Sequence, residues 1–288
     1  MRRSCQLVLS ALLTLLVAPG CGDDGGSADG DTGDSDGTVI DAGPGDRFPD
    51  ASTEPPADAG PTGGGGACEA GNYQCNNCED DDGDDLIDGA DPECTGSIDD
   101  DESSFETGIP GDNKDDKWQD CFFDGNSGAG DDGCRWHTCC ALGAEGGSDC
   151  PVDHQFDPDT DCPPQTQECI RKCGKLTPPG CDCFGCCTIC DDVGCEDIFI
   201  NPAVSPDCTQ ETIHNHNKCL LCEKSEDCNG GECDVDECIL CPGQDEGDLP
   251  DSCGGMNECP GGETSCDVSA DCAANEYCSA GCCVNVVE

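Results

Sequence analysis

Carboxylate side chains are crowded into residues 79–94, which read EDDDGDDLIDGADPEC. Carboxylates a few ångströms apart repel each other, and a bound cation removes this repulsion because it reverses the local electrostatics. Oxygen donors recur along the run at the spacing of a calcium-binding loop. The predicted Ca²⁺ ligands are Asp80, Asp82, Asp84, the carbonyl of Leu86, Asp88 and Asp91.

Three features separate this acidic loop, residues 80–91, from an EF-hand. Asp85 stands at the turn position where a glycine with positive φ is usual, so strain there is expected to weaken the affinity. The last ligand is Asp91, which is shorter than the usual Glu, and no amphipathic helix precedes the loop. The stretch resembles the Asp-rich calcium repeats of thrombospondin type 3, which implies a structural Ca²⁺. A solvated acidic loop is the alternative.

Two further groups of residues have the composition of metal sites. Oxygen donors alternate in a Gly-rich segment and predict a second cation site, with plain turns as the alternative: Asp124, Asn126, Asp131 and Asp132. The run CDCFGCCTIC, residues 181–190, has the thiolate spacings of metallothioneins and zinc sites. A tetrahedral zinc site could be completed nearby by His214, His216, Cys219 and Cys222. In an exported protein the same cysteines are expected to form disulfides instead.

The composition decides which elements can position these residues. The 288 residues include 34 Cys, 40 Gly and 19 Pro, and 4% are aromatic, so little apolar surface is available for a large core. Proteins of this kind are held together by disulfides, each contributing about 2–4 kcal/mol. The predicted fold class is therefore small disulfide-rich modules, mostly loops and short β-hairpins. Phe122, Phe123 and Trp136 are expected to seed a small core.

One short helix and one strand are predicted. The segment DCPPQTQECIRKC, residues 161–173, begins with Asp161 as a candidate cap and two prolines in the first turn. Cys169 and Cys173 are four residues apart, which places their thiols on the same side of that helix. Residues 197–201, DIFIN, are expected to form a short strand.

The N-terminus predicts export. Arg2 and Arg3 precede an apolar stretch at residues 7–18 and small residues before Cys21, which is the pattern of a signal peptide spanning residues 1–20. The junction resembles a bacterial lipobox, which implies that Cys21 is lipidated, with ordinary secretion as the alternative. Removal of Cys5 with the signal and lipidation of Cys21 leave 32 of the 34 cysteines, enough for 16 disulfides.

The remaining chain divides into five blocks by composition. Residues 21–67 form a Gly/Pro-rich acidic stretch that is predicted to be a disordered tether. The predicted blocks after it are an Asp-rich calcium-loop module, a Gly/Asp/Cys-rich module, a Cys-rich module and a region with a cysteine repeat: residues 68–106, 107–150, 151–221 and 222–288.

The repeat pairs CEKSEDCNGGEC, residues 222–233, with CDVSADCAANEYC, residues 266–278. The second copy resembles the N-terminal cysteine-rich module of the Dickkopf family, which implies small disulfide-linked hairpins. The junction, the acidic loop, QDCFFDGNSGAGDDGC and LTPPGCDCFGCC together resemble cysteine-rich lipoproteins of the myxobacterial type. That resemblance implies location and architecture only.

The net charge of −53 excludes nucleic acid as a partner, because the surface repels phosphates and attracts divalent cations or basic groups. Enzymatic chemistry and organic cofactors are not expected. The chain has four His, neither G-x-S-x-G nor H-E-x-x-H occurs, and no βαβ pattern surrounds its C-x-x-C pairs.

The sequence thus predicts an outer-membrane or cell-surface lipoprotein, or a secreted protein, that contacts the membrane only through its lipid. Disulfides and calcium would stabilise a surface for structure or for binding an extracellular protein or glycan. A thiolate metal-binding protein and a secreted inhibitor or toxin-like ligand are the alternatives.

Overall fold

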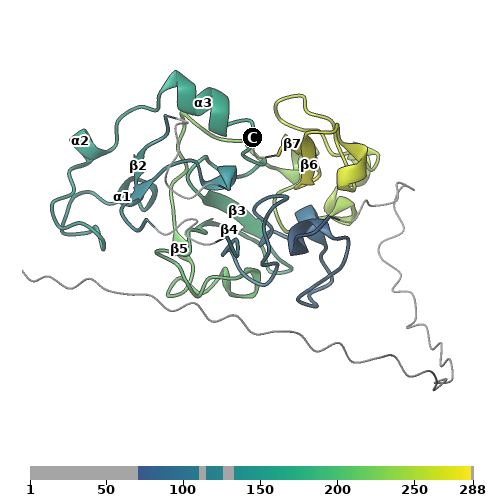
Figure 1. The fold of residues 1–288 in the computed structure, drawn as a ribbon, viewed down its shortest axis with the longest axis horizontal. Helices are drawn as coiled ribbons and strands as arrows, with labels where there is room; N and C mark the ends of the chain where they lie inside the picture. The colour runs from purple at the N-terminus through teal and green to yellow at the C-terminus, as the bar shows by residue number, and fades with distance from the viewer. Residues whose placement is uncertain (1–70, 110–114, 126–132, 287–288) are drawn as a thin grey trace, which may run out of the picture. The chain divides into compact units, whose positions relative to one another are not determined.

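Three small antiparallel sheets and three short helices organise the computed structural model, which describes residues 71–109, 115–125 and 133–286 (Figure 1). All of these residues belong to one unit of the chain, Ala59–Glu288. The predicted signal peptide, the tether and Cys21 lie outside the described residues, and so do Asn126, Asp131 and Asp132.

The largest sheet has three strands in the order β3 (Cys186–Cys190), β4 (Cys195–Phe199) and β5 (Leu220–Leu221). The β3–β4 hairpin forms because Asp191 accepts the backbone N–H groups of Val193 and Gly194, at 2.8 and 3.0 Å, within its turn. Strand β4 overlaps the predicted strand at residues 197–201. The other sheets pair β1 (Trp118–Gln119) with β2 (Trp136–His137) and β6 (Glu276–Ser279) with β7 (Cys282–Asn285).

The described helices are α1 (Thr138–Ala141), α2 (Pro158–Asp161) and α3 (Gln167–Cys173). Helix α3 is the predicted one, but Thr166 caps it through the N–H of Cys169, so the prediction of Asp161 as the cap was wrong. Asp161 instead ends α2, and the two prolines lie between the helices. Single 3₁₀ turns complete the described part: η1 Gln74–Asn76, η2 Asp88–Ala90, η3 Phe122–Asp124, η4 Gln210–Thr212, η5 Val235–Glu237, η6 Glu246–Asp248, η7 Asp251–Cys253 and η8 Ser269–Asp271.

Every cysteine among the described residues is in a disulfide. Fifteen pairs account for all of them except Cys78, which is also disulfide-bonded. Cys169 and Cys173 are fully buried on the same side of α3, as predicted, and they bond Cys134 and Cys121. The predicted disulfide-rich fold of loops and short hairpins is confirmed.

The main core surrounds these bridges. Phe122 and Phe123 are buried in it and Trp136 packs against it, as predicted. Trp136 also stacks on Phe184, with ring centroids 5.6 Å apart. The core extends further than the sequence indicated, because it also contains side chains of the three-stranded sheet: Ile189, Ile198 and, just beyond it, Ile200.

Disulfides join blocks that the composition had separated. Three of them link residues 107–150 to residues 151–221: Cys121–Cys173, Cys134–Cys169 and Cys140–Cys162. Two more link residues 151–221 to residues 222–288: Cys183–Cys228 and Cys186–Cys222. These three blocks are therefore covalently crosslinked.

The two copies of the cysteine repeat have different bonds. In the second copy Cys266 bonds Cys278, and the segment continues into the β6–β7 hairpin, which fits the predicted disulfide-linked hairpin. In the first copy the cysteines bond outside the copy: Cys222 to Cys186, Cys228 to Cys183 and Cys233 to Cys241. The two copies therefore have similar cysteine spacing, with the first interval the same and the second one residue longer in the second copy, but different disulfide patterns.

The acidic module, residues 71–106, packs against the β6–β7 hairpin (Figure 1). The hydroxyl of Tyr277 donates to the carbonyl of Cys75 at 3.0 Å, and the N–H of Ala280 donates to the carbonyl of Gly89 at 3.1 Å. A side chain at Gly89 would collide with the carbonyl oxygen of Cys278, since its Cβ would lie 1.7 Å away. Glycine is therefore required for this close approach.

Candidate metal centre

Three of the predicted ligands come together at the exposed start of the acidic loop. Carboxylate oxygens of Asp80, Asp82 and Asp84 all lie within 4.8 Å of one another. The loop turns around Asp80, whose carboxylate accepts the N–H groups of Gly83 at 2.6 Å and Asp85 at 3.2 Å. This turn requires a positive φ at Asp85, which has φ +78°, as the sequence predicted. The geometry could offer several oxygens to one hard cation.

Glu102 holds the acidic loop in shape by accepting hydrogen bonds from its backbone at two points. Its fully buried carboxylate accepts the N–H of Asp81 at 2.6 Å and the N–H of Asp88 at 2.9 Å. The carboxylate of Asp88 accepts the N–H groups of Asn77 at 2.9 Å and Cys78 at 3.2 Å, so it binds the chain that enters the loop. Asp88 was predicted as a ligand, but it is not part of the Asp80–Asp82–Asp84 group.

Asp99 stabilises the next turn in a similar way. Its buried carboxylate accepts the N–H and the hydroxyl of Thr95, at 3.0 and 2.8 Å, and the N–H of Asp101 at 3.1 Å. Burial raises the pKa of Asp99 to about 7 and the pKa of Glu102 to about 7, against the opposing effect of these hydrogen bonds. Ionisation of these groups thus has an energetic cost that a nearby cation would reduce.

Asp91, another predicted ligand, is not part of the Asp80–Asp82–Asp84 group either, because it is grouped with Cys94 and Glu102. Glu93 lies two residues after it in the chain. Both are buried, with side chains 2% and 4% exposed. Asp91 Oδ1 accepts the N–H of Glu93 at 2.7 Å, and Glu93 Oε1 accepts the N–H of Gln210 at 2.5 Å. Among the described residues, Asp91 Oδ2 and Glu93 Oε2 have no hydrogen-bond partner. Burial raises the pKa of both carboxyl groups, and the charge of the neighbouring Glu93 raises the pKa of Asp91 further. The two side chains can therefore share a hydrogen bond when one of them is protonated.

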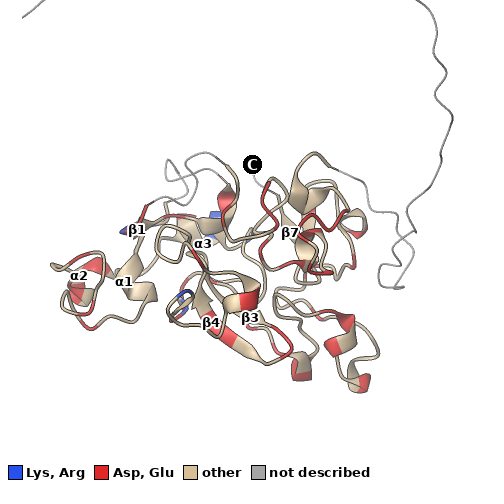
Figure 2. Ribbon diagram, turned by 90° about the horizontal axis from the view of Figure 1, so that it is seen from below, with Lys and Arg blue, Asp and Glu red and all other residues tan. Residues whose placement is uncertain are grey.

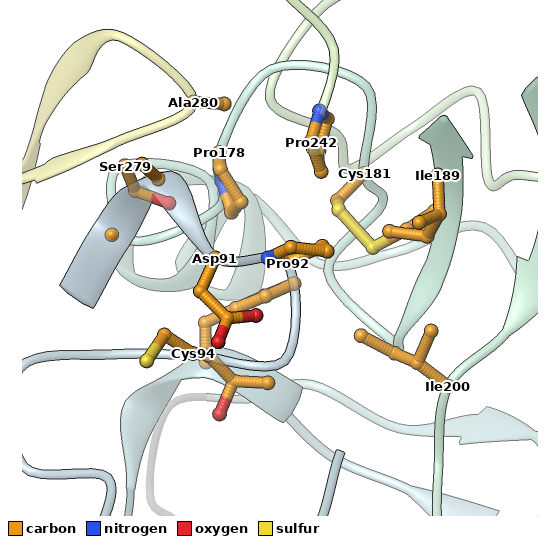
Figure 3. Close-up of a pocket in the computed structure, with 15 residues that line it drawn as sticks. Asp91, Pro92, Cys94, Pro178, Cys181, Ile189, Ile200, Pro242, Ser279 and Ala280 are labelled. Carbon is orange, nitrogen blue, oxygen red and sulfur yellow. A yellow bond between two sulfur atoms is a disulfide. The ribbon is translucent and has the colours of Figure 1, made fainter. Parts of the chain in front are cut away.

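A cavity beside Asp91 is too small to be a substrate pocket. It measures about 20 Å³, and its lining includes Pro178, Ile189, Ile200 and Pro242 (Figure 3). A volume of about one water molecule leaves no room for an organic ligand. In Figure 3 the Asp91 carboxylate lies near Cys94, which is bonded to Cys75.

The cysteines of the possible zinc site form disulfides, as expected for an exported protein, so the zinc alternative was wrong for its sulfur ligands. Cys219 bonds Cys208 and Cys222 bonds Cys186, and a disulfide sulfur lacks the negative charge that zinc ligation requires. The two histidines contact carboxylates instead: His214 lies 3.0 Å from Asp191 and 3.3 Å from Glu196, and His216 lies 3.8 Å from Glu196. The CDCFGCCTIC cysteines are likewise all disulfide-bonded.

The second predicted cation site is described only in part. Asp124 is buried at the end of η3, whereas Asn126, Asp131 and Asp132 lie outside the described residues. That site remains a prediction.

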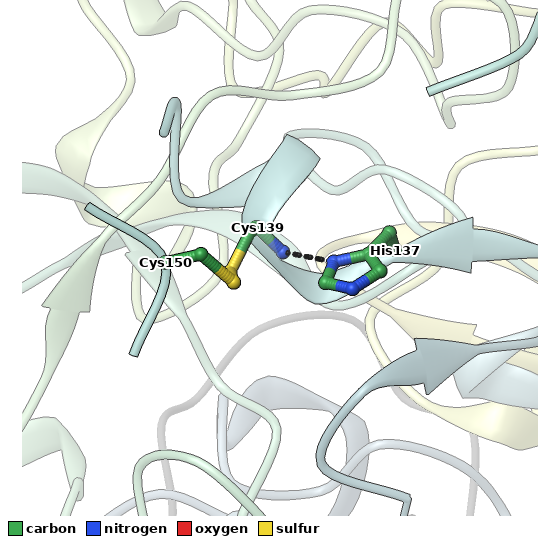
Figure 4. A group of neighbouring side chains, drawn as sticks. All are labelled: His137, Cys139 and Cys150. Carbon is green, nitrogen blue, oxygen red and sulfur yellow. Dashed lines mark hydrogen bonds between the residues drawn. A yellow bond between two sulfur atoms is a disulfide. The ribbon is translucent and has the colours of Figure 1, made fainter. Parts of the chain in front are cut away.

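A buried histidine lies beside another disulfide (Figure 4). His137 Nδ1 accepts the N–H of Cys139 at 3.0 Å, which caps α1, and Cys139 bonds Cys150. His137 Nε2 lies 3.6 Å from Asp153, whose carboxylate also pairs with Lys117 at 2.5 Å. Burial lowers the pKa of His137, so the neutral ring is favoured. This arrangement holds a helix terminus and presents no free thiol.

Sequence reasoning missed Glu93, Asp99 and Glu102. All three are acidic residues just beyond the loop, and acidic residues are common throughout this chain (Figure 2). Burial distinguishes them, and burial depends on contacts with distant segments such as that between Glu93 and Gln210. The only signal in the sequence was that the acidic run continues past Asp91 through DPEC and IDDDE.

Comparisons of this chain with protein-family models, with curated proteins and with solved structures found no match. The resemblances to thrombospondin type 3 repeats, to the Dickkopf module and to myxobacterial lipoproteins therefore stay predictions. Among the described residues, no helix has the length and apolar character needed to cross a membrane. The density of disulfides is that of an exported or extracellular protein.

Proposed function

We propose that this chain is a cell-surface lipoprotein, anchored through Cys21, whose disulfide-linked blocks present a rigid surface for structure or binding. The observation that carries the proposal is that all described cysteines are disulfide-bonded, including cysteines whose spacing is typical of metal sites. Such bonds persist in oxidising compartments, and the apolar segment at residues 7–18 before Cys21 has the pattern of an export signal.

Calcium has a structural role in this proposal. The acidic loop brings three exposed carboxylates close together, and other carboxylates of the acidic module, such as those of Asp99 and Glu102, are buried. A Ca²⁺ at the loop would offset their mutual repulsion, and its binding free energy would become folding free energy for the acidic module. Extracellular sites of this kind bind with dissociation constants of about 10⁻⁴–10⁻³ M, which ambient calcium can fill.

The anchor is tested by changing Cys21→Ser and following the protein through membrane fractionation. The variant should move from the membrane fraction to the soluble fraction, because the residue that carries the lipid is lost. Cys5→Ser is the matched control, since Cys5 lies within the predicted signal peptide and its loss should leave fractionation unchanged. A Cys21→Ser protein that stays in the membrane fraction like the wild type would show that the anchor is wrong.

A further inference from the structure

Cys78 has a disulfide partner that lies outside the described residues. Every described cysteine is bonded, and fifteen bonds pair all of them with one another except Cys78. Of the 34 cysteines in the chain, Cys5, Cys21 and Cys68 lie outside the described residues. The partner of Cys78 is therefore one of these three.

Distance along the chain favours Cys68. Cys5 lies within the predicted signal peptide and would be removed on export. Cys68 lies 10 residues before Cys78 and Cys21 lies 57 residues before it. The effective concentration of two groups joined by a flexible chain falls with about the −3/2 power of its length, so ring closure with Cys68 is favoured roughly tenfold.

The first described residues bring the chain back toward Cys78. The N–H of Gly71 donates to the carbonyl of Asn76, which lies two residues before Cys78. Cys68 lies three residues before Gly71, and three residues span at most about 10 Å. Cys78 itself is only half-buried. Its thiol is thus accessible from the side on which the chain arrives, and Cys68 is within reach of it.

Cys78 also lies at the entrance of the acidic loop. Its N–H and the N–H of Asn77 both donate to the carboxylate of Asp88, at 3.2 and 2.9 Å, so this segment is held against the far end of the loop. Its neighbour Cys75 bonds Cys94 on the other side of the loop. A bond at Cys78 therefore attaches whatever it carries directly to the acidic module.

We infer that Cys68 and Cys78 are bonded to each other, and that this disulfide fastens the tether to the entrance of the acidic loop. The bond leaves Cys21 as the one cysteine of the mature chain outside the disulfides, so its thiol is available for the lipid. The statement about the lipid rests on the proposed function, whereas the assignment of the bond does not.

The experiment compares Cys68→Ser with Cys21→Ser in the full-length exported protein. Each protein is unfolded without reduction and treated with N-ethylmaleimide, and mass spectrometry locates the labelled cysteines. Cys68→Ser should be labelled at Cys78, because its partner is lost, and Cys21→Ser should leave Cys78 unlabelled. Label at Cys78 in the Cys21→Ser protein, with none there in Cys68→Ser, would overturn the inference.

Peptide mapping of the unreduced wild type tests the bond without any substitution. Chymotrypsin cleaves after Tyr73, which is exposed and separates Cys68 from Cys78 in the chain. The peptide that contains Cys68 should be recovered joined to the peptide that contains Cys78, and the two should separate on reduction. Recovery of the Cys68 peptide by itself, or joined to a peptide that contains Cys21, would contradict the inference.

The results also separate this bond from the anchor. If Cys21 proves to be the partner of Cys78, the assignment and the lipid anchor both fail, because one sulfur cannot carry both bonds. If the Cys68–Cys78 bond is found and Cys21→Ser still stays in the membrane fraction, the anchor fails and the assignment stands.

Discussion

The backbone conformation of Asp85 is expected to limit how tightly the acidic loop binds calcium. Its φ of +78° is a conformation that glycine adopts readily and that strains other residues, whereas its side chain is exposed. The loop therefore contains a residue that opposes the turn its own ligands need. Calcium binding would have to supply the free energy that stabilises this turn.

Asp85→Gly should bind calcium more tightly, by about fivefold if about 1 kcal/mol of strain is relieved. Calorimetry on the mature protein measures the change. Asp81→Gly is the control, because Asp81 does not have a positive φ and the substitution removes the same charge without relieving strain. Equal or weaker binding by Asp85→Gly would mean that the Asp85 carboxylate contributes to the site.

At the residue scale, the sequence could predict only features that depend on residues close together in the chain. The positive φ at Asp85 and the grouping of Asp80, Asp82 and Asp84 follow from spacing along a single turn. The burial of Glu93 and Glu102 could not be predicted, because it depends on how distant segments pack over the loop. That Cys219 and Cys222 form disulfides was expected for an exported protein, whereas their partners could not be predicted because the fold sets them.

At the scale of elements, the buried carboxylates of the acidic module stabilise its turns by accepting hydrogen bonds from backbone N–H groups. Glu102 accepts two N–H groups from the acidic loop, and Asp99 binds the turn that follows Thr95. Both have a pKa of about 7 in the fold, above the usual range of carboxyl groups. The folded protein without calcium therefore holds protons that the unfolded chain has already released near neutral pH.

The calcium-free protein should thus lose stability as the pH rises from 5 to 8. A carboxyl group with a raised folded pKa stabilises the fold below its unfolded pKa, and this contribution is lost as the pH rises through the folded pKa. Melting temperatures in chelator should fall across this range, by roughly 2–4 °C for each kcal/mol lost in a domain of this size. Added calcium should flatten the slope, because the ion favours the charged carboxylates.

The control for this prediction is the slope of melting temperature against pH for the Glu102→Gln variant in chelator. Only the slope is compared, so the absolute stability of the variant does not matter. Removing one group with a raised pKa should make the slope in chelator shallower, whereas Glu79→Gln should leave it unchanged, because Glu79 is exposed. Identical slopes in all three proteins would show that general charge repulsion causes the pH dependence and that the buried groups do not.

Helix α3 shows which parts of an element are predictable. Its existence and the common side of Cys169 and Cys173 follow from helical spacing. Its start does not, because Asp161 and Thr166 are both suitable caps and the two prolines between them fit either choice. The structure uses Asp161 to end α2 and Thr166 to begin α3.

At the scale of the whole molecule, disulfides replace much of the usual core. Those that cross between predicted blocks, such as Cys121–Cys173 and Cys183–Cys228, close long stretches of chain and restrict the unfolded state most. Composition predicted the fold class, but the crosslinking of the blocks could not be predicted, because many pairings are compatible with one set of cysteines.

Alkylation of the native, unreduced protein should add no label, because every described cysteine is bonded. Mass spectrometry before and after reduction checks this, and the mature protein should show 16 disulfides. The count agrees with the fifteen pairs found here together with the bond of Cys78. Several free thiols or stoichiometric zinc in the native protein would favour the thiolate metal-binding alternative.

The bonds that cross the stretch between Cys150 and Cys162 also determine what a protease could do to this protein. A cut anywhere in that stretch would leave two polypeptides still joined through Cys121–Cys173, Cys134–Cys169 and Cys140–Cys162. The pieces could not diffuse apart unless those bonds were reduced. A molecule exposed to secreted proteases could therefore be nicked there and still remain in one piece.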